Sequence, residues 1–256
     1  MITGIDHIAL AVADVARSAA DMAAVLGRAP VVNDPNARAR SAMLRLDNLA
    51  VGLGAMENAT ENGSVVIRLV LAAGDFDETM RRLARRGVPG TLRHDEPMFD
   101  IEPTATHGVP ISLVAASAPG QPNTDADIAG LDHVVIRTPD PERAVALYGG
   151  RLGLDLRLDR TNTSYGSRML FFVCGGIVIE VTHDLKAGVG AGPDLIWGWA
   201  WRANDIGRAH ARMTTSGVAV SELRTGRRPG TQVFTVKSHA GGVPTLVIGG
   251  DGLQRS

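Results

Sequence analysis

Two acid–base side chains stand out because each lies inside an apolar segment. His133 follows Leu131 in an alternating run, and Glu180 interrupts the apolar residues 177–182. Because side chains alternate along a strand, His133 and Glu180 each face away from their apolar neighbours. A carboxylate in so apolar a strand is costly unless it is paired or bound to a metal. The alternative is a hydrogen-bonded histidine and a glutamate at an exposed sheet edge.

The setting of His133 occurs twice in the chain. Residues 5–10 (IDHIAL) return as residues 131–136 (LDHVVI), and each copy has an aspartate seven residues after its histidine, Asp14 and Asp140. A helical pattern follows each copy. A duplicated unit with a histidine on the same face of its first strand suggests a cavity built between repeats.

Three arginines are predicted to lie on the cavity-facing side of first strands. Arg68, Arg137 and Arg202 all fall on the side that is expected to line the cavity. A guanidinium group there is a natural clamp for a carboxylate or phosphate, which would make the ligand anionic. The alternative is that these side chains extend to the rim and into solvent.

Composition limits the kinds of partner. The chain has 256 residues, 45% of them hydrophobic, with a net charge of −1, so it can bury a core and has no broad attraction for nucleic acid or anionic membrane. No signal peptide or membrane-spanning run is recognisable. We expect a soluble, cytoplasmic protein, monomeric or homodimeric, that binds a small molecule. Cys174, the single cysteine, is expected to be a buried small hydrophobe.

The elements fall into four modules, each reading as a strand, a helix and two or three further strands. The predicted helices span residues 15–26, 77–86, 141–152 and 205–215. One such unit cannot cover both faces of its own sheet, so the modules should pair. We expect an α+β fold of four βαβββ modules in two cupped mixed sheets. The predicted domains are residues 1–118 and 128–252.

Which modules pair is left open by the sequence. The first could pair with the second and the third with the fourth, or the first with the fourth and the second with the third. Only the latter arrangement would bring Arg68 to the cavity that contains His133 and Glu180.

The chain resembles the vicinal oxygen chelate superfamily in four features. These are the Asp-His-apolar opening strand, the aspartate seven residues later, the helix that ends in Leu-Gly, and the module that occurs four times. That group includes glyoxalase I, methylmalonyl-CoA epimerase, extradiol dioxygenases and bleomycin- and fosfomycin-resistance proteins. The resemblance covers essentially the whole chain and is strongest over residues 131–181. It implies cups that hold a divalent metal, which chelates two neighbouring oxygens of the substrate.

The resemblance implies that His133 and Glu180 are metal ligands and catalytic residues, with His7 completing the site. A histidine of the turns before the closing strands, His107 or His239, could replace His7 in that role. The implied cofactor is Zn, Ni, Mn or Fe(II). The remaining ligand positions depart from the family pattern, since they hold Gly52, Arg68, Ser112, Gly198 and Leu246.

The resemblance implies a metal-dependent lyase or isomerase of the glyoxalase kind, acting on a small oxygenated anion. Two alternatives stay open. One is an extradiol-type ring-cleaving dioxygenase, which needs two histidines and a carboxylate on one iron. The other is a metal-free protein that sequesters a ligand, as resistance proteins do. The missing ligands favour sequestration, whereas the retained His133–Glu180 pair opposes it.

Overall fold

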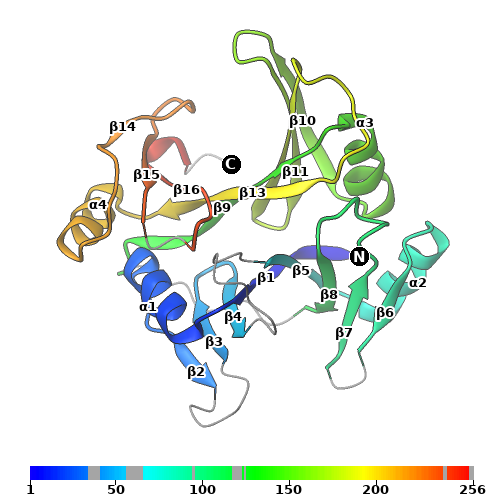
Figure 1. The fold of residues 1–256 in the computed structure, drawn as a ribbon, viewed down its shortest axis with the longest axis horizontal. Coiled ribbons are helices and arrows are strands. Elements are labelled where there is room, and N and C mark those ends of the chain that lie inside the picture. The colour runs from blue at the N-terminus through cyan, green and yellow to red at the C-terminus, as the bar shows by residue number, and fades with distance from the viewer. Residues whose placement is uncertain are drawn as a thin grey trace. The chain divides into compact units, whose positions relative to one another are not determined.

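The computed structural model describes residues 1–33, 41–55, 66–93, 96–116, 123, 125–238 and 241–253. Within these residues the strands form two eight-stranded sheets (Figure 1). Each sheet mixes parallel and antiparallel pairs; β5 is parallel to β8, for example, whereas β7 is antiparallel to β8. The α+β fold predicted from the sequence, with repeated βαβββ modules in two mixed sheets, is confirmed.

The first sheet contains the strands of the first two modules, in the order β2-β3-β4-β1-β5-β8-β7-β6. Their bounds are β1 Ile2–Val12, β2 Val31–Asn33, β3 Ser41–Arg45, β4 Ala50–Ala55, β5 Val66–Ala73, β6 Gly90–Leu92, β7 Met98–Ile101 and β8 Ile111–Ala115.

The second sheet repeats this order with the strands of the third and fourth modules, β10-β11-β12-β9-β13-β16-β15-β14. Their bounds are β9 Ile128–Arg137, β10 Asp155–Asn162, β11 Ser167–Cys174, β12 Ile177–Asp184, β13 Leu195–Ala203, β14 Arg224–Thr225, β15 Gln232–Val236 and β16 Thr245–Gly249. Arg68 on β5 therefore belongs to a different sheet from His133 and Glu180.

The helices begin within one residue of their predicted starts. The α-helices are α1 Val15–Leu26, α2 Phe76–Arg85, α3 Pro141–Ala144 and α4 Ile206–Thr215. Their N-caps are Asp14, Asp75, Asp140 and Asp205, and each carboxylate accepts a hydrogen bond from a backbone N–H of the first turn. These bonds satisfy donors that have no partner within the helix, which explains the recurrence of an aspartate at this position.

The third helix differs from the sequence-based expectation of one α-helix over residues 141–152. After α3 the chain continues as a π-helix, η1 Val145–Arg151, and the N–H of Leu152 bonds the carbonyl of Leu147, five residues earlier. Gly149 and Gly150 lie in this turn, and glycine is a weak helix former. A 3-10 helix, η2 Asp251–Leu253, follows β16.

Alternation along the strands separates a buried helix face from an open face. In the third module Val134 and Ile136 are fully buried, and Tyr148 of η1 packs on Phe172 of β11 with ring centroids 5.5 Å apart. The residues that alternate with Val134 and Ile136 on β9, His133 and Val135, are only partly buried. We call the side of β9–β12 that carries His133 and Glu180 the open face.

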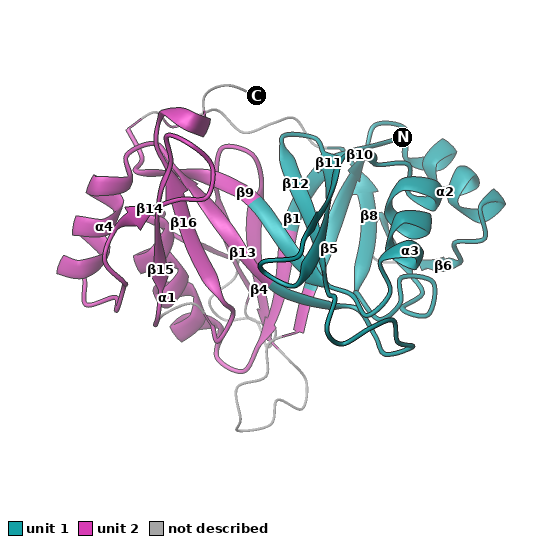
Figure 2. Ribbon diagram, turned by 90° about the horizontal axis from the view of Figure 1, so that it is seen from above, with its two compact units in different colours: residues 1–7, 68–118, 133–197 teal, residues 8–67, 119–132, 198–256 magenta. Residues whose placement is uncertain are grey.

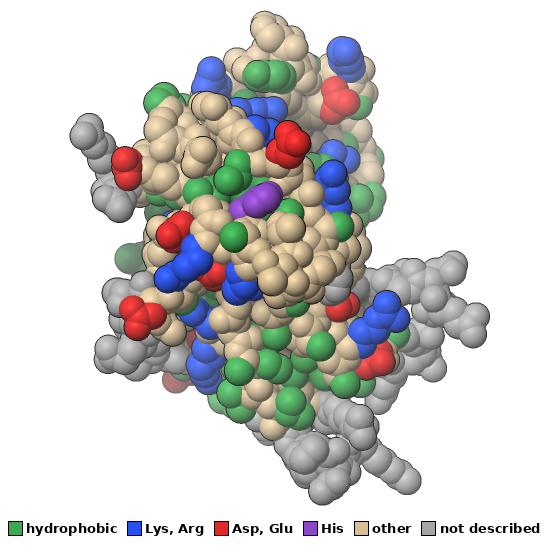
Figure 3. Space-filling model, turned by 90° about the vertical axis from the view of Figure 1, so that its left-hand side faces the viewer, with side chains coloured by type: hydrophobic (Ala, Val, Ile, Leu, Met, Phe, Trp, Pro, Cys, Tyr) green, Lys and Arg blue, Asp and Glu red, His purple; other side chains and the backbone are tan. Residues whose placement is uncertain are grey.

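Backbone packing divides the described chain into two compact units (Figure 2). Unit 1 comprises residues 1–7, 68–118 and 133–197, and unit 2 comprises residues 8–67, 119–132 and 198–256. Acidic and basic side chains are interspersed on the face shown in Figure 3. No described helix is both long and apolar enough to cross a membrane.

Candidate functional site

His133 and Glu180 are brought together on the open face in unit 1. Strands β9 and β12 run parallel, and their register places Val178 opposite His133 and Val135 opposite Glu180. The imidazole Nε2 lies 3.8 Å from a carboxylate oxygen of Glu180, and each side chain keeps about one-fifth of its surface exposed, 20% and 19%. The two groups share one face, within reach of a ligand from solvent.

The distance between these two groups is compatible with one shared ion. Metal–nitrogen and metal–oxygen bonds are each about 2.0–2.2 Å long, so donors up to about 4.2 Å apart can contact the same ion. The 3.8 Å separation meets this condition. An imidazole with a carboxylate suits borderline divalent cations such as zinc, nickel, manganese and iron(II). The two residues therefore fit part of a metal site.

Further protein ligands are not gathered around this pair within the described residues. Those residues contain no group of three or more histidine, cysteine, aspartate or glutamate side chains that could hold a metal. The Nδ1 atom of His7 lies 2.7 Å from a carboxylate oxygen of Asp6. His239 lies outside the described residues. The ligand roles of His133, Glu180 and His7 stay predictions.

Arg68, predicted to clamp an anionic substrate, is already neutralised by an acid of its own sheet. Its Nη1 donates to Asp100 Oδ1 at 2.9 Å and to Ser112 Oγ at 2.7 Å. Arg93 donates to the other oxygen of Asp100 at 2.7 Å. Burial opposes ionisation of Asp100, but the hydrogen bonds from Arg93 and Ser112, with the two positive charges, lower its pKa. In the second module, Arg68 and Ser112 hold an internal ion-pair network at the expected ligand positions.

The other two arginines that were predicted to bind the substrate lie in different surroundings. Arg137 is exposed, and its guanidinium carbon lies 4.3 Å from the ring centroid of Trp197. Arg202 lies in unit 2 on β13, partly buried and opposite Ile248 of β16. On that same face Ala200 packs with Val233 and Ile248 in an apolar cluster. The substrate-binding roles of all three arginines remain untested.

A buried polar cluster in unit 1 escaped the sequence-based prediction. The carboxylate of Asp194 is fully buried and accepts a 2.6 Å hydrogen bond from Arg143. Among the described residues, three buried atoms of this cluster have no hydrogen-bond partner: Nε of Arg143, Oδ2 of Asp194 and the hydroxyl of Tyr148. Burial, assisted by the charge of Asp194, raises the pKa of Tyr148. Sequence alone had no signal for this cluster, because its members lie in different elements.

The turn that contains His107 borders this cluster. His107 has a positive φ of 55°, and its carbonyl accepts a 2.7 Å hydrogen bond from the N–H of Asp194. Burial, together with the positive charge of Arg143, lowers the pKa of His107.

Cys174 is buried, as predicted, and burial raises the pKa of its thiol to about 12. His183 is also buried, with Nδ1 3.1 Å from the carbonyl oxygen of Thr138.

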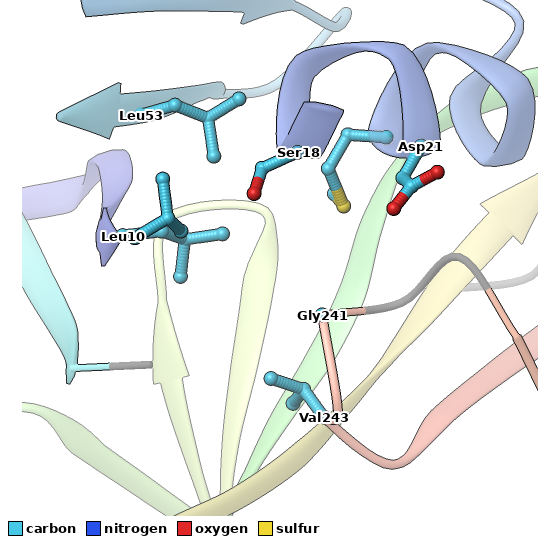
Figure 4. A pocket seen from close by; sticks show the side chains of 8 residues that line it. Leu10, Ser18, Asp21, Leu53, Gly241 and Val243 are labelled. Atoms are coloured by element: carbon cyan, nitrogen blue, oxygen red, sulfur yellow. The ribbon is translucent and has the colours of Figure 1, made fainter. Parts of the chain in front are cut away.

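A small apolar pocket lies in unit 2, beside α1 (Figure 4). Leu10, Leu53 and Val243 point toward the space next to the helix, and Ser18 and Asp21 border it from α1. The lining is mostly apolar and includes none of the predicted site residues. It therefore offers no alternative location for the chemistry of His133 and Glu180.

Comparison with known proteins gives a family match for part of the chain. The sequence model of the Glyoxalase/Bleomycin resistance protein/Dioxygenase superfamily matches residues 130–242. Among curated proteins, none matches the chain.

Solved structures share the fold over nearly the whole chain. A mutant of 4-hydroxymandelate synthase from Streptomyces coelicolor is 15% identical, with a TM-score of 0.74, over 98% of this chain and 94% of that one. The Mn(II)-bound glyoxalase from Novosphingobium aromaticivorans is 18% identical, with a TM-score of 0.71, over 97% and 82%. At such identities the likeness establishes the fold alone. Residues 130–242 thus match the model of the Glyoxalase/Bleomycin resistance protein/Dioxygenase superfamily, within a chain that has a glyoxalase-like fold almost throughout.

Proposed function

We propose that this protein is a metal-dependent lyase or isomerase that acts on a small oxygenated anion. The observation that carries the proposal is the 3.8 Å approach of His133 Nε2 and Glu180 on the open face. Both side chains stay partly exposed there, so a substrate has access to them. The family match over residues 130–242 includes both residues.

In this proposal His133 and Glu180 hold the ion and so determine where the reacting part of the substrate lies. A bound divalent ion would act as a Lewis acid on a carbonyl next to the proton that is removed. Val135 and Val178 border the pair on the open face, in register with Glu180 and His133. These apolar side chains would reduce the access of water to the reacting atoms.

Manganese is the first ion to test, because the glyoxalase of similar fold was solved with Mn(II). Metal content should be measured by mass spectrometry after incubation with manganese, nickel, zinc or iron(II), in wild-type protein and in Glu180→Gln. Glu222→Gln is the matched control, since it makes the same chemical change at an exposed position outside residues 133–197. We expect near-stoichiometric metal in wild type and control, and loss of metal in Glu180→Gln.

Either of two results would overturn the proposed site. One is a wild-type protein that takes up none of these ions, and the other is a Glu180→Gln variant that keeps its metal. The second candidate function is then a metal-free protein that sequesters a ligand. The lack of a three-ligand group within the described residues favours that alternative. A sequestering protein should keep its ligand affinity in Glu180→Gln.

A further inference from the structure

A β-bulge in β10, the edge strand of the second sheet, changes the side to which its residues project. Leu156 of β10 pairs with Phe172 of β11, and Leu158 pairs with Phe171, so Arg157 is the extra residue of the bulge. In a regular strand, residues two positions apart project to the same side. Here the two leucines are opposite neighbouring residues of β11, which project to different sides. Directly opposite residues share a side, so the two leucines lie on different faces of the sheet.

Contacts of β11 identify these two faces. Phe172 packs against Tyr148 of η1, with ring centroids 5.5 Å apart, so this residue and its partner on β10 belong to the helix face. Phe171 pairs with Glu180 of β12, so Phe171 and Leu158 belong to the open face. The bulge therefore turns one leucine toward the face that carries the proposed metal ligands. Bulges next to functional sites commonly re-aim a side chain in this way.

The open face has a row of apolar side chains that begins at the proposed metal site and ends at the edge of the sheet. Glu180 pairs with Phe171, and Phe171 pairs with Leu158. Neighbouring strands lie about 4.8 Å apart, so this row extends roughly 10 Å beyond the carboxylate strand. In the next row of the same face, Val178 pairs with Val173 of β11. We call Phe171, Leu158, Val173 and Val178 the apolar strip.

The apolar strip is accessible to a ligand. Leu158 is 48% exposed, and the other three side chains are partly exposed. A single exposed leucine needs no explanation, but contiguous apolar side chains beside polar groups are typical of a ligand-binding surface. The strip is continuous with the proposed metal ligands, since Phe171 is directly opposite Glu180. The occupant that fits is therefore the apolar part of the molecule whose oxygens bind the metal.

We propose that the apolar strip binds an alkyl chain of the substrate, and that Leu158 determines the chain length that still adds affinity. This inference rests on the proposed function, in which His133 and Glu180 hold the metal. The substrate is then an anion with two neighbouring oxygens at one end and an alkyl chain that lies over Phe171 and reaches Leu158. Because β10 is the edge strand, methylene groups beyond Leu158 leave the strip and add nothing.

Straight-chain 2-oxo acids are suitable probes, because each carries two neighbouring oxygens at one end. 2-Oxobutanoate, 2-oxohexanoate and 2-oxooctanoate should be titrated by calorimetry into Mn(II)-loaded protein. Each methylene group that is buried on the strip should raise the affinity roughly threefold. We therefore expect 2-oxohexanoate to bind roughly tenfold more tightly than 2-oxobutanoate, with a further gain for 2-oxooctanoate.

Leu158→Gln tests the far end of the apolar strip. It should abolish most of the gain from 2-oxohexanoate to 2-oxooctanoate. The gain from 2-oxobutanoate to 2-oxohexanoate and the metal content should stay as in wild type, because Phe171 and the metal ligands are kept. Leu223→Gln is the matched control, since it makes the same change at a leucine that is 37% exposed and lies outside residues 133–197. The control should keep both gains.

Equal affinities for the three acids in wild-type protein, or a gain for 2-oxooctanoate that survives Leu158→Gln, would overturn the role of the strip. So would a failure of all three acids to bind. Metal content, measured on the same samples, separates this inference from the proposed function. Stoichiometric metal without any dependence on chain length contradicts the strip alone. A dependence on chain length that Leu158→Gln reduces in protein without metal supports the strip and contradicts the metal site.

Discussion

The buried carboxylate of Asp194 pairs with the guanidinium of Arg143 at 2.6 Å, across 51 residues of chain. Arg143 also donates to the carbonyl of Gly192, and the N–H of Asp194 donates to the carbonyl of His107. Within unit 1 this arrangement fastens the segment that leads into β13 to both α3 and the turn that precedes β8.

Removing the acid of this pair should be strongly destabilising. Asp194→Ala leaves Arg143 partly buried without its carboxylate, and we expect the free energy of unfolding to fall by about 3–5 kcal/mol in urea titrations. Asp155→Ala is the control, because its pair with Arg157 is exposed at 64% and 70%. That substitution should cost about 0–1 kcal/mol. Similar losses in the two variants would contradict the importance assigned to the buried pair.

The hydroxyl of Tyr148 should be dispensable for folding, although its ring is not. The oxygen is buried and has no hydrogen-bond partner in the described part of the chain, so Tyr148→Phe removes a desolvated group while the packing on Phe172 is kept. We expect the free energy of unfolding to be unchanged or to rise by about 1 kcal/mol. Tyr148→Ala should cost about 3–5 kcal/mol. A large loss in Tyr148→Phe would mean that the hydroxyl is satisfied, for instance by a buried water.

The N-cap aspartates should stabilise the folded protein through their acceptor oxygens. Asp205 Oδ1 accepts the N–H of Arg208 at 2.9 Å. We expect Asp205→Ala to lower the free energy of unfolding by about 1 kcal/mol, whereas Asp205→Asn should stay close to wild type because asparagine caps equally well. Chemical denaturation checks both variants. Equal losses in the two would show that the charge, rather than the hydrogen bond, is what counts.

Stability should depend on the protonation of His107. Burial and the charge of Arg143 lower the pKa of His107 in the folded protein, so the unfolded chain binds the proton more tightly. The stabilising contribution is therefore complete above the unfolded-state pKa of about 6.5 and decreases as the pH falls below it. His107→Asn, which tolerates the positive φ, should reduce the slope of unfolding free energy against pH in this range. An identical slope in wild type and variant would contradict this assignment.

Local patterns account for much of what the sequence predicts. The four aspartates recur because each helix needs an acceptor at its N-cap, and that requirement is met within a few residues. The shared face of His133 and Glu180 follows from alternation along each strand. The sequence missed the change from an α-helix to a π-helix at Val145, since α-turns and π-turns differ by only one residue in hydrogen bonding.

Contacts between distant elements were decided by the tertiary structure alone. Arg68 was predicted to be a substrate clamp, yet β7 brings Asp100 against it and neutralises it. Strand β10 was too weak a pattern to place, and only the register of the sheet sets it beside β11.

The sequence by itself therefore determined the modules, the helix starts to within one residue, and the shared face of His133 and Glu180. All of these depend on periods of two or 3.6 residues and on local hydrogen bonds. The partners of those residues across strands depend on register and packing, which are set by the whole sheet and leave no mark on the local pattern.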